Sequence, residues 1–127
     1  MVTAFFPGKF QPPHLGHILT INKIYNQYDK IIIGVTEGPP RVMSLEDTCN
    51  ILRETFKYMP KIEIYPIINT MDNETAIPYL PKDWDVILTG NEYVVGLAKK
   101  YGWNYKRIAR SKGIGYSGTE IRKLYGL

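Results

Sequence analysis

Cysteine, histidine and long apolar runs are all scarce in this sequence of 127 residues. The single cysteine, Cys49, excludes an intramolecular disulfide and a zinc cluster built on cysteines, and it indicates a reducing compartment. We interpret Cys49 as a core residue. No apolar stretch approaches the roughly 20 residues of a membrane-spanning helix, and no basic segment followed by a long apolar core stands near the N-terminus. These features predict a cytoplasmic protein without a membrane segment.

Charge of one sign is not concentrated anywhere along the chain. The formal net charge of +4 favours anionic partners, which include both nucleic acids and phosphorylated small molecules. Apart from Lys99-Lys100 and a looser group between Lys106 and Lys112, the basic residues are scattered, and they are not interleaved with aromatic residues. We therefore expect small anionic ligands rather than nucleic acid.

The remaining composition is that of an ordinary globular protein, with 44% hydrophobic and 22% charged residues, and it predicts one domain over residues 1–127. Apolar, β-prone runs that end in turns predict five strands, at residues 2–6, 30–35, 61–67, 85–88 and 105–109. Apolar residues at helical spacing predict helices over 14–28 and 44–56, a third that carries Val94, Leu97 and Tyr101, and a last one over 117–125. Residues 69–80 read as irregular.

Alternating strands and helices predict a fold of the α/β class, a single Rossmann-like doubly wound domain. We expect a five-stranded parallel sheet with helices on both faces and right-handed crossovers. Ligands of such sheets bind beyond the carboxyl ends of the strands, where the strand order reverses. The segments that follow the strands are therefore the ones to search for functional residues.

The segment from Gly8 to His17, GKFQPPHLGH, follows the first predicted strand and contains both histidines of the chain. His14 and His17 are three residues apart, so at the start of a helix they project from one face. Unpaired N–H groups and the helix dipole attract phosphate to that end, and two imidazoles add hydrogen-bond donors. The alternative is that His14 caps the helix and His17 is a satisfied, half-buried histidine.

A second segment, Tyr116-Ser117-Gly118-Thr119-Glu120-Ile121-Arg122, stands near the C-terminus. Ser117 and Thr119 offer hydroxyl and backbone donors to phosphate oxygens, and Arg122 adds a forked, permanently charged donor. Considered alone, Ser117 to Glu120 is a helix capping box. Together, the two segments predict a single phosphate site formed by the start and the end of the chain.

The first segment resembles the HxGH signature of the nucleotidylyltransferase superfamily, written GxFxPxHxGH, and the second resembles its ISSTxIR signature. Lys9 to Ile18 and the ending SGTEIR are most similar to adenylyltransferases for nicotinamide mononucleotide, of the archaeal and the bacterial bifunctional NAD-regulator type. Asp85 to Asn91 is similar to their (F/W)DVxxxGN segment, where the loop meets the adenosine.

This resemblance implies transfer of AMP from ATP to nicotinamide mononucleotide, or to a similar phosphorylated acceptor, with release of pyrophosphate. Mg²⁺ would be carried mainly by the substrate phosphates, without a metal site built from the protein, and relatives imply a homo-oligomer. The residues expected at the triphosphate and its transition state are His14, His17, Lys9 and Arg122. Those expected to bind the nucleotide are Phe6, Gly8, Phe10, Gly16, Gly90, Asn91, Ser117, Gly118 and Thr119, and those expected to bind the acceptor are Arg41, Asn73 and Tyr79.

Two departures leave the acceptor open. Where the archaeal enzymes have an acid and an arginine, this chain has Asp47-Thr48, so Arg41 or Arg53 would have to replace a phosphate-binding arginine. Ala76 aligns with a tryptophan that stacks on nicotinamide, and Tyr79 or Trp84 are the alternative rings. The rival acceptors are pantetheine phosphate, FMN and sugar- or alcohol-phosphates with CTP. The rival classes are a non-catalytic nucleotide-binding module and a nucleic-acid-binding domain.

Overall fold

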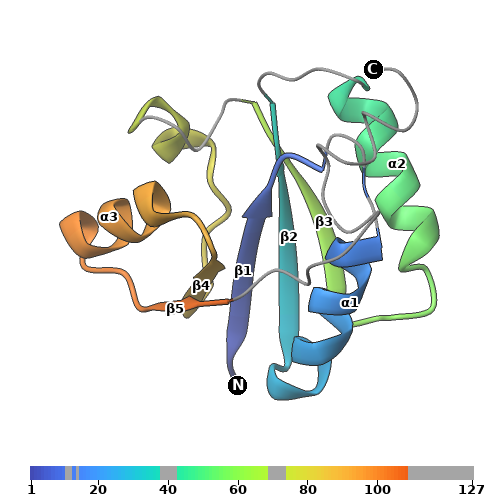
Figure 1. The fold of residues 1–127 in the computed structure, drawn as a ribbon, viewed down its shortest axis with the longest axis horizontal. Coiled ribbons are helices and arrows are strands. Elements are labelled where there is room, and N and C mark those ends of the chain that lie inside the picture. Colours follow the sequence, from blue (N-terminus) through green and yellow to red (C-terminus); the bar gives the residue numbers. More distant parts are fainter. Residues whose placement is uncertain (11–12, 14, 38–42, 69–73, 109–127) are drawn as a thin grey trace.

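The architecture is a parallel sheet of five strands in the order β3-β2-β1-β4-β5 (Figure 1). The computed structural model describes residues 1–10, 13, 15–37, 43–68 and 74–108. The strands are β1 (Thr3–Gly8), β2 (Lys30–Thr36), β3 (Ile62–Ile67), β4 (Val86–Thr89) and β5 (Tyr105–Arg107). The predicted α/β Rossmann-like fold is thereby confirmed.

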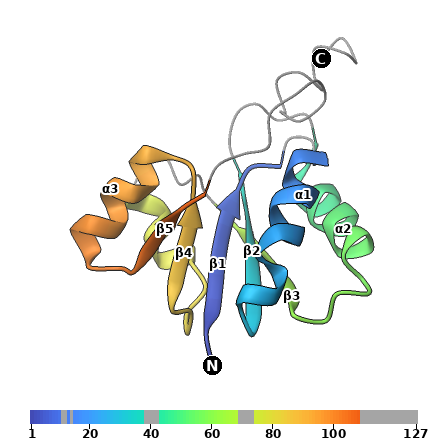
Figure 2. The same cartoon turned by 60° about the horizontal axis from the view of Figure 1, so that its bottom comes forward.

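Helices cover both faces of this sheet, as Figures 1 and 2 show. The two helices α1 (Leu15–Ile24) and α2 (Leu45–Thr55) pack on one face. The third helix, α3 (Glu92–Tyr101), packs on the other face together with the 3-10 helix η2 (Glu74–Tyr79). The two-sided covering explains why the central strands are rich in β-branched residues, since a strand buried on both faces has no polar side.

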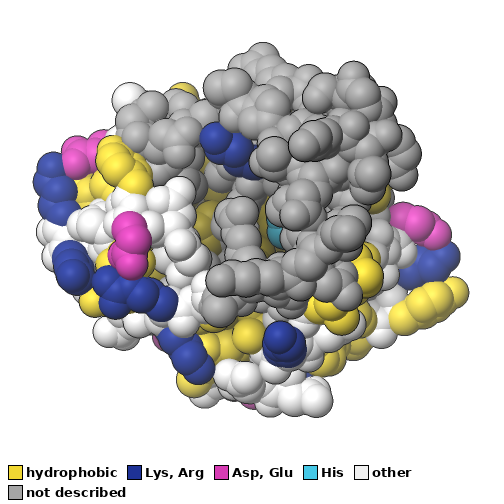
Figure 3. Space-filling view, in the orientation of Figure 1, with side chains coloured by type: hydrophobic (Ala, Val, Ile, Leu, Met, Phe, Trp, Pro, Cys, Tyr) yellow, Lys and Arg dark blue, Asp and Glu magenta, His cyan; other side chains and the backbone are white. Residues whose placement is uncertain are grey.

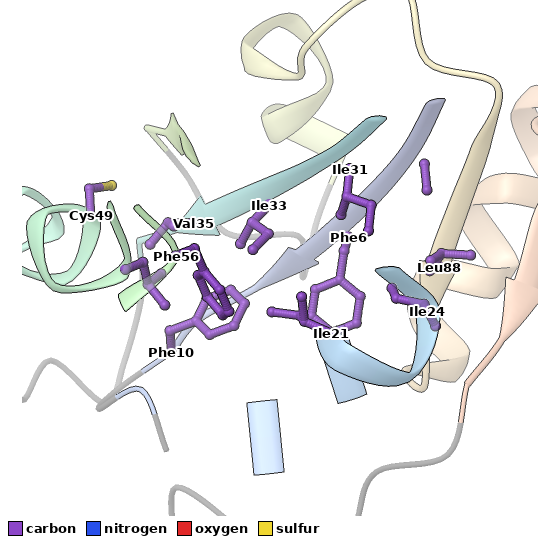
Figure 4. Close-up of a cluster of buried hydrophobic side chains, with 12 residues drawn as sticks. Phe6, Phe10, Ile21, Ile24, Ile31, Ile33, Val35, Cys49, Phe56 and Leu88 are labelled. Carbon is purple, nitrogen blue, oxygen red and sulfur yellow. The ribbon is translucent and has the colours of Figure 1, made fainter. Parts of the chain in front are cut away.

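Two apolar clusters, one on each face of the sheet, form the core. On β1, Ala4 and Phe6 point into the first cluster while Phe5 points into the second, as the alternation of a strand requires. The first cluster, drawn in Figure 4, joins β1 and β2 to α1 and α2. Cys49 is 2% exposed within it, which confirms its interpretation as a core residue.

The boundaries of the elements differ from the predicted ones at a few points. The first helix stops being α-helical at Ile24 and continues as a 3-10 turn, η1 (Tyr25–Gln27), before β2 begins. The segment expected to be irregular contains η2, whose backbone is compatible with Pro78. Ser44, where the helix predicted over 44–56 begins, is the N-cap of α2, because its Oγ accepts a hydrogen bond from the Asp47 N–H at 3.0 Å. The predicted helix over 117–125 lies outside the described residues.

The strand order places a reversal point between β1 and β4. From β1 the chain crosses to β2 on one side, and β4 pairs with β1 on the other, with Phe5 level with Ile87. Crossover connections therefore diverge above the carboxyl ends of these two strands, and a crevice opens there in sheets of this kind. The residues that leave β1 and β4 border this crevice.

Candidate active site

The connection from β1 to α1 forms one wall of the crevice. It leaves the sheet at Gly8, passes through the half-buried Lys9 and turns at Phe10, which has a left-handed backbone with φ of 53°. The ring of Phe10 points inward and is 1% exposed. The hydroxyl of Thr36, the last residue of β2, donates a hydrogen bond to the Gly8 carbonyl at 3.3 Å. The carboxyl ends of the two central strands are thus held together beneath this turn.

His17 stands in the first turn of α1, directly over this connection. Its side chain is half-buried, and its ring centroid lies 4.4 Å from that of Phe10. In the space-filling view, a small patch of histidine surface is visible near the middle of the face (Figure 3). An imidazole that is packed on one side and partly exposed can still donate a hydrogen bond to a phosphate.

The N-terminal end of α1 is electrostatically different from those of the other helices. The first turn of α2 contains Glu46 and Asp47 and that of α3 contains Glu92, whereas the first turn of α1 contains no acidic residue. Carboxylates near a helix N-terminus interact favourably with its positive dipole, and among the described residues of this turn none takes the place of an external anion. Gly16, in the same turn, is buried and its carbonyl accepts a hydrogen bond from Thr20 Oγ1 at 2.8 Å.

The turn from β4 to α3 forms the opposite wall. The Thr89 hydroxyl accepts a hydrogen bond from the Asn91 N–H at 3.0 Å, and Asn91 Oδ1 in turn accepts one from the Tyr93 N–H at 2.9 Å. Asn91 is therefore the N-cap of α3, and its side-chain amide NH₂ is not the group used by the cap. Sequence reasoning missed Thr89, although a threonine just before a turn is a known signal for such bonds.

Strand β5 pairs with β4 and lies against the turn from β4 to α3. The Ile108 N–H donates to the Thr89 carbonyl at 3.1 Å, and a Cβ added at Gly90 would lie 2.9 Å from the Ile108 carbonyl oxygen. The Arg107 guanidinium reaches across to Glu92, with Nε and Oε1 3.0 Å apart, and lowers the pKa of that carboxyl through this hydrogen bond. Only glycine fits between the two backbones at position 90.

The structure brings one group of the predicted residues to this edge of the sheet and places others elsewhere. Gly8, Lys9, Phe10, Gly16 and His17 lie together at the end of β1, and Gly90 and Asn91 lie at the end of the neighbouring β4. Phe6 is 8% exposed in the first cluster, with its ring centroid 6.1 Å from that of Phe10. Tyr79, at the end of η2, is 47% exposed. The remaining predicted residues lie outside the described part: His14, Arg41, Asn73, Ser117, Gly118, Thr119 and Arg122.

Two residues considered as substitutes are far from the crevice. Trp84 precedes β4, at the amino end of the sheet, where it packs between Phe5 and Trp103 at 5.3 and 5.4 Å and donates from Nε1 to the Pro81 carbonyl. Arg53 lies in the last turn of α2, about 12 Å along the axis from the first residue of that helix. Arg53 thus lies toward the end of α2 that is remote from its N-terminus, and Arg41 lies outside the described residues. Ala76, aligned with the stacking tryptophan, is buried in the second cluster.

Within the described ranges, no three histidine, cysteine, aspartate or glutamate side chains are grouped so that they could hold a metal ion. The helices of the described part are all too short or too polar to cross a membrane. The site thus offers a helix N-terminus, an imidazole and backbone donors. This donor set suits an anionic ligand.

Comparison with known proteins agrees with this geometry. The model of the cytidylyltransferase-like family matches residues 5–124. A nicotinamide-nucleotide adenylyltransferase of Pyrobaculum arsenaticum is 32% identical over 141 residues, covering 98% of this chain and 76% of that protein. A phosphopantetheine adenylyltransferase of Carboxydothermus hydrogenoformans is 30% identical over 110 residues, covering 79% of this chain and 65% of that protein.

Among solved structures, a bifunctional NMN adenylyltransferase/ADP ribose pyrophosphatase from Francisella tularensis, complexed with AMP and a manganese ion, has the same fold. It superposes with a TM-score of 0.72 at 18% identity and covers 98% of this chain. The chain spans only 41% of that longer protein. From its parallel sheet and the family match over nearly all of its length, the chain belongs to the cytidylyltransferase-like family.

Proposed function

We propose that this protein transfers AMP from ATP to nicotinamide mononucleotide and releases pyrophosphate. The observation that carries the proposal is the arrangement at the carboxyl ends of β1 and β4. There, His17 and an acid-free helix N-terminus stand on one wall, and the Gly90-Asn91 turn stands on the other. The similarity to archaeal nicotinamide-nucleotide adenylyltransferases supports the acceptor.

The reaction we propose is an in-line displacement. A phosphate oxygen of the acceptor attacks the α-phosphorus of ATP, the bond from that phosphorus to the bridging oxygen breaks, and pyrophosphate leaves with the electron pair. The chain contributes positioning and charge stabilisation rather than a covalent intermediate. His17 donates a hydrogen bond to the triphosphate from the first turn of α1, while Lys9 adds positive charge beside it.

The rest of the proposed machinery follows from the resemblance of the two signatures. His14 and Arg122 act on the phosphates with His17, and Ser117, Gly118 and Thr119 bind the β- and γ-phosphates. Gly90 and Asn91 contact the adenosine from the other wall. For the acceptor we propose Arg41, Asn73 and Tyr79, since Arg53 lies at the far end of α2.

A magnesium ion fits this site as a companion of ATP. Substrate oxygens and water would be its main ligands, as is usual for Mg²⁺ with phosphates, and the described residues present no cluster of three or more ligating side chains for it. When bound, the ion neutralises charge on the phosphate oxygens. His17 and the α1 N-terminus would bind phosphate oxygens of ATP directly.

A second acceptor, pantetheine phosphate, is the main alternative. A relative that carries the name of that activity is 30% identical to this chain. Ala76 supplies no ring for nicotinamide, because its side chain is a methyl group, and it is buried in the second cluster. The two acceptors share the attacking phosphate, so the alternative changes the acceptor pocket and leaves the nucleotide side as proposed.

The test is a substrate panel with separate detection of both products. The protein is incubated with Mg²⁺ and ATP or CTP, together with nicotinamide mononucleotide, pantetheine phosphate, FMN or glycerol phosphate. Pyrophosphate and the joined product are measured by chromatography. We expect the dinucleotide of ATP and nicotinamide mononucleotide. A larger rate with another acceptor would replace the proposed one, and triphosphate binding without pyrophosphate release from any pair would indicate a non-catalytic module.

Matched variants on α1 separate the site from the scaffold. His17→Ala should lower turnover by orders of magnitude, because it removes a donor to the transition state. Lys23→Ala, in the last turn of the same helix and exposed, should leave turnover unchanged. We also propose that the protein is cytoplasmic and self-associates. Fractionation of cells and light scattering after size-exclusion chromatography test these two points.

A further inference from the structure

We infer that Phe10 is a positioning residue: its buried ring supports the imidazole of His17 from the core side and fixes the direction in which His17 faces the crevice. This inference rests on the proposed function of the same site. It deepens that function by assigning a role to a side chain that itself touches no substrate.

The first observation is the contact between the two rings. Their centroids lie 4.4 Å apart at an interplanar angle of 59°, a tilted arrangement at the short end of the range for aromatic pairs. Phe10 is 1% exposed, whereas His17 is half-buried. Of the two rings in contact, that of Phe10 is therefore the more deeply buried, and that of His17 is partly exposed.

The second observation is that the Phe10 ring has no room to retreat. A Cβ added at Gly8 would lie 2.9 Å from its Cε2 and 3.1 Å from its Cζ, so the ring already rests on the backbone of β1. Phe10 belongs to the first apolar cluster, and Figure 4 shows it among Ile21, Ile33, Val35 and Phe56. A ring held on these sides transmits its own fixed position to the imidazole that rests on it.

The third observation is the backbone of Phe10. Its φ of 53° lies in the left-handed region, which bulky residues rarely adopt and which glycine or asparagine adopts more readily. The chain nevertheless has an aromatic residue at this turn. Unfavourable backbone conformations persist where the surroundings require them, and they are concentrated at functional sites. Here the requirement is the ring beneath His17.

Together these observations divide the roles at the turn. A ligand in the crevice can reach Phe10 through its backbone, but a ring that is 1% exposed offers it no surface. The side chain acts through His17, by restricting the rotamers of the imidazole before the ligand arrives. Pre-organisation of this kind is what a hydrogen-bond donor to a transition state requires.

The direct test measures the imidazole without using activity. The chain has two histidines, so their ring-proton resonances are assigned in NMR spectra by comparison with His17→Ala. Phe10→Leu should shift the His17 resonances because it removes the adjacent ring. Phe56→Leu is the matched control, since Phe56 is 4% exposed in the same cluster, and it should leave them in place. Unmoved His17 resonances in folded Phe10→Leu would overturn the inference.

A second variant covers the case in which Phe10→Leu does not fold. Gly8→Ala presses on the same ring from β1, where the new Cβ would meet it at 2.9 Å, and it should shift the His17 resonances as well. Unchanged resonances in this variant would equally overturn the proposed support.

Kinetics then separate positioning from general stability. Phe10→Leu should lower kcat by up to about 10²-fold with KM for ATP little changed, as expected for a misplaced catalytic group. In the His17→Ala background the same substitution should cost nothing further, because residues that act as a unit are not additive. Additive losses, or an equal loss in Phe56→Leu, would contradict the inference. A wild-type protein without transferase activity would contradict the proposed function alone, because the His17 resonances of Phe10→Leu and Phe56→Leu still test whether Phe10 supports the imidazole.

Discussion

Replacing Gly90 by alanine is expected to separate the β4–α3 turn from β5. The added Cβ would lie 2.9 Å from the Ile108 carbonyl oxygen, closer than such contacts occur, and the neighbour is backbone rather than a movable side chain. Either the turn or β5 must shift, at the expense of the hydrogen bond from the Ile108 N–H to the Thr89 carbonyl. Overpacking of this kind costs about 1–3 kcal/mol of unfolding free energy.

The size of the effect can be stated as a melting temperature. A chain of 127 residues has an unfolding entropy of about 270 cal/mol/K near 60 °C, so each kcal/mol changes Tm by about 4 °C. Gly90→Ala should therefore lower Tm by about 4–11 °C in differential scanning calorimetry. It should also weaken ATP binding measured by titration calorimetry, because the proposed adenosine contacts at Gly90 and Asn91 move with the turn.

The matched control lies six residues further along. Gly96, on the exposed side of α3, has no atom within 4 Å of its would-be Cβ. Since glycine is poor in a helix interior, Gly96→Ala should raise the unfolding free energy by about 0.5–1 kcal/mol and Tm by about 2–4 °C. Equal effects of the two substitutions, or an unchanged Tm in Gly90→Ala, would refute the close contact with β5.

Three further outcomes are expected. Asn91→Ala removes the α3 cap and should lower the unfolding free energy by about 1 kcal/mol. It should also lower the affinity for ATP measured by titration calorimetry. Ser44→Ala, which removes the α2 cap, should lower the unfolding free energy alone. Hydrogen bonds from Lys100 and Tyr101 hold the pKa of Glu74 below its usual value in the folded protein. The ionised Glu74 carboxylate therefore stabilises the fold above the pKa of the unfolded chain, and this stabilisation is lost as the pH falls through the lowered pKa of the folded protein. Glu74→Gln should flatten the acid side of the curve of Tm against pH, and curves identical to those of the wild type would exclude this contribution. Gly34→Ala places a Cβ 2.5 Å from Phe5 Cε1 in the middle of β2 and should cost about 1–3 kcal/mol in urea unfolding, with an unchanged midpoint arguing against the packing.

The sheet was predictable because its signals are local. The run from Ile31 to Val35 is dense in β-branched residues, and this composition indicates a strand buried on both faces before any partner is known. Ser44 followed by acidic residues likewise indicates a helix start, and the structure confirms it. Strand order was predicted only as a class, since the pairing of β1 with β4 joins residues about eighty positions apart.

The site was predictable in its location and less so in its contacts. His17 and Asn91 belong to recognisable segments, but the support of His17 by Phe10 depends on a left-handed backbone that a bulky residue is not expected to adopt. From the sequence, Trp84 was an alternative for the ring that stacks on nicotinamide. Its partner Trp103 is distant in sequence, so only the packed structure shows that Trp84 is part of the aromatic core at the amino end of the sheet.

The aromatic cluster on the second face also determines which part of the protein tryptophan fluorescence monitors. Both tryptophans of the chain, Trp84 and Trp103, belong to it, with ring centroids 5.4 Å apart and Phe5 and Tyr101 at its ends. Indole emission therefore monitors the α3 side alone, while the α1 and α2 side, with His17, has none among the described residues. An emission-monitored melt that coincides with the loss of circular dichroism would mean that both halves of the molecule unfold as one cooperative unit.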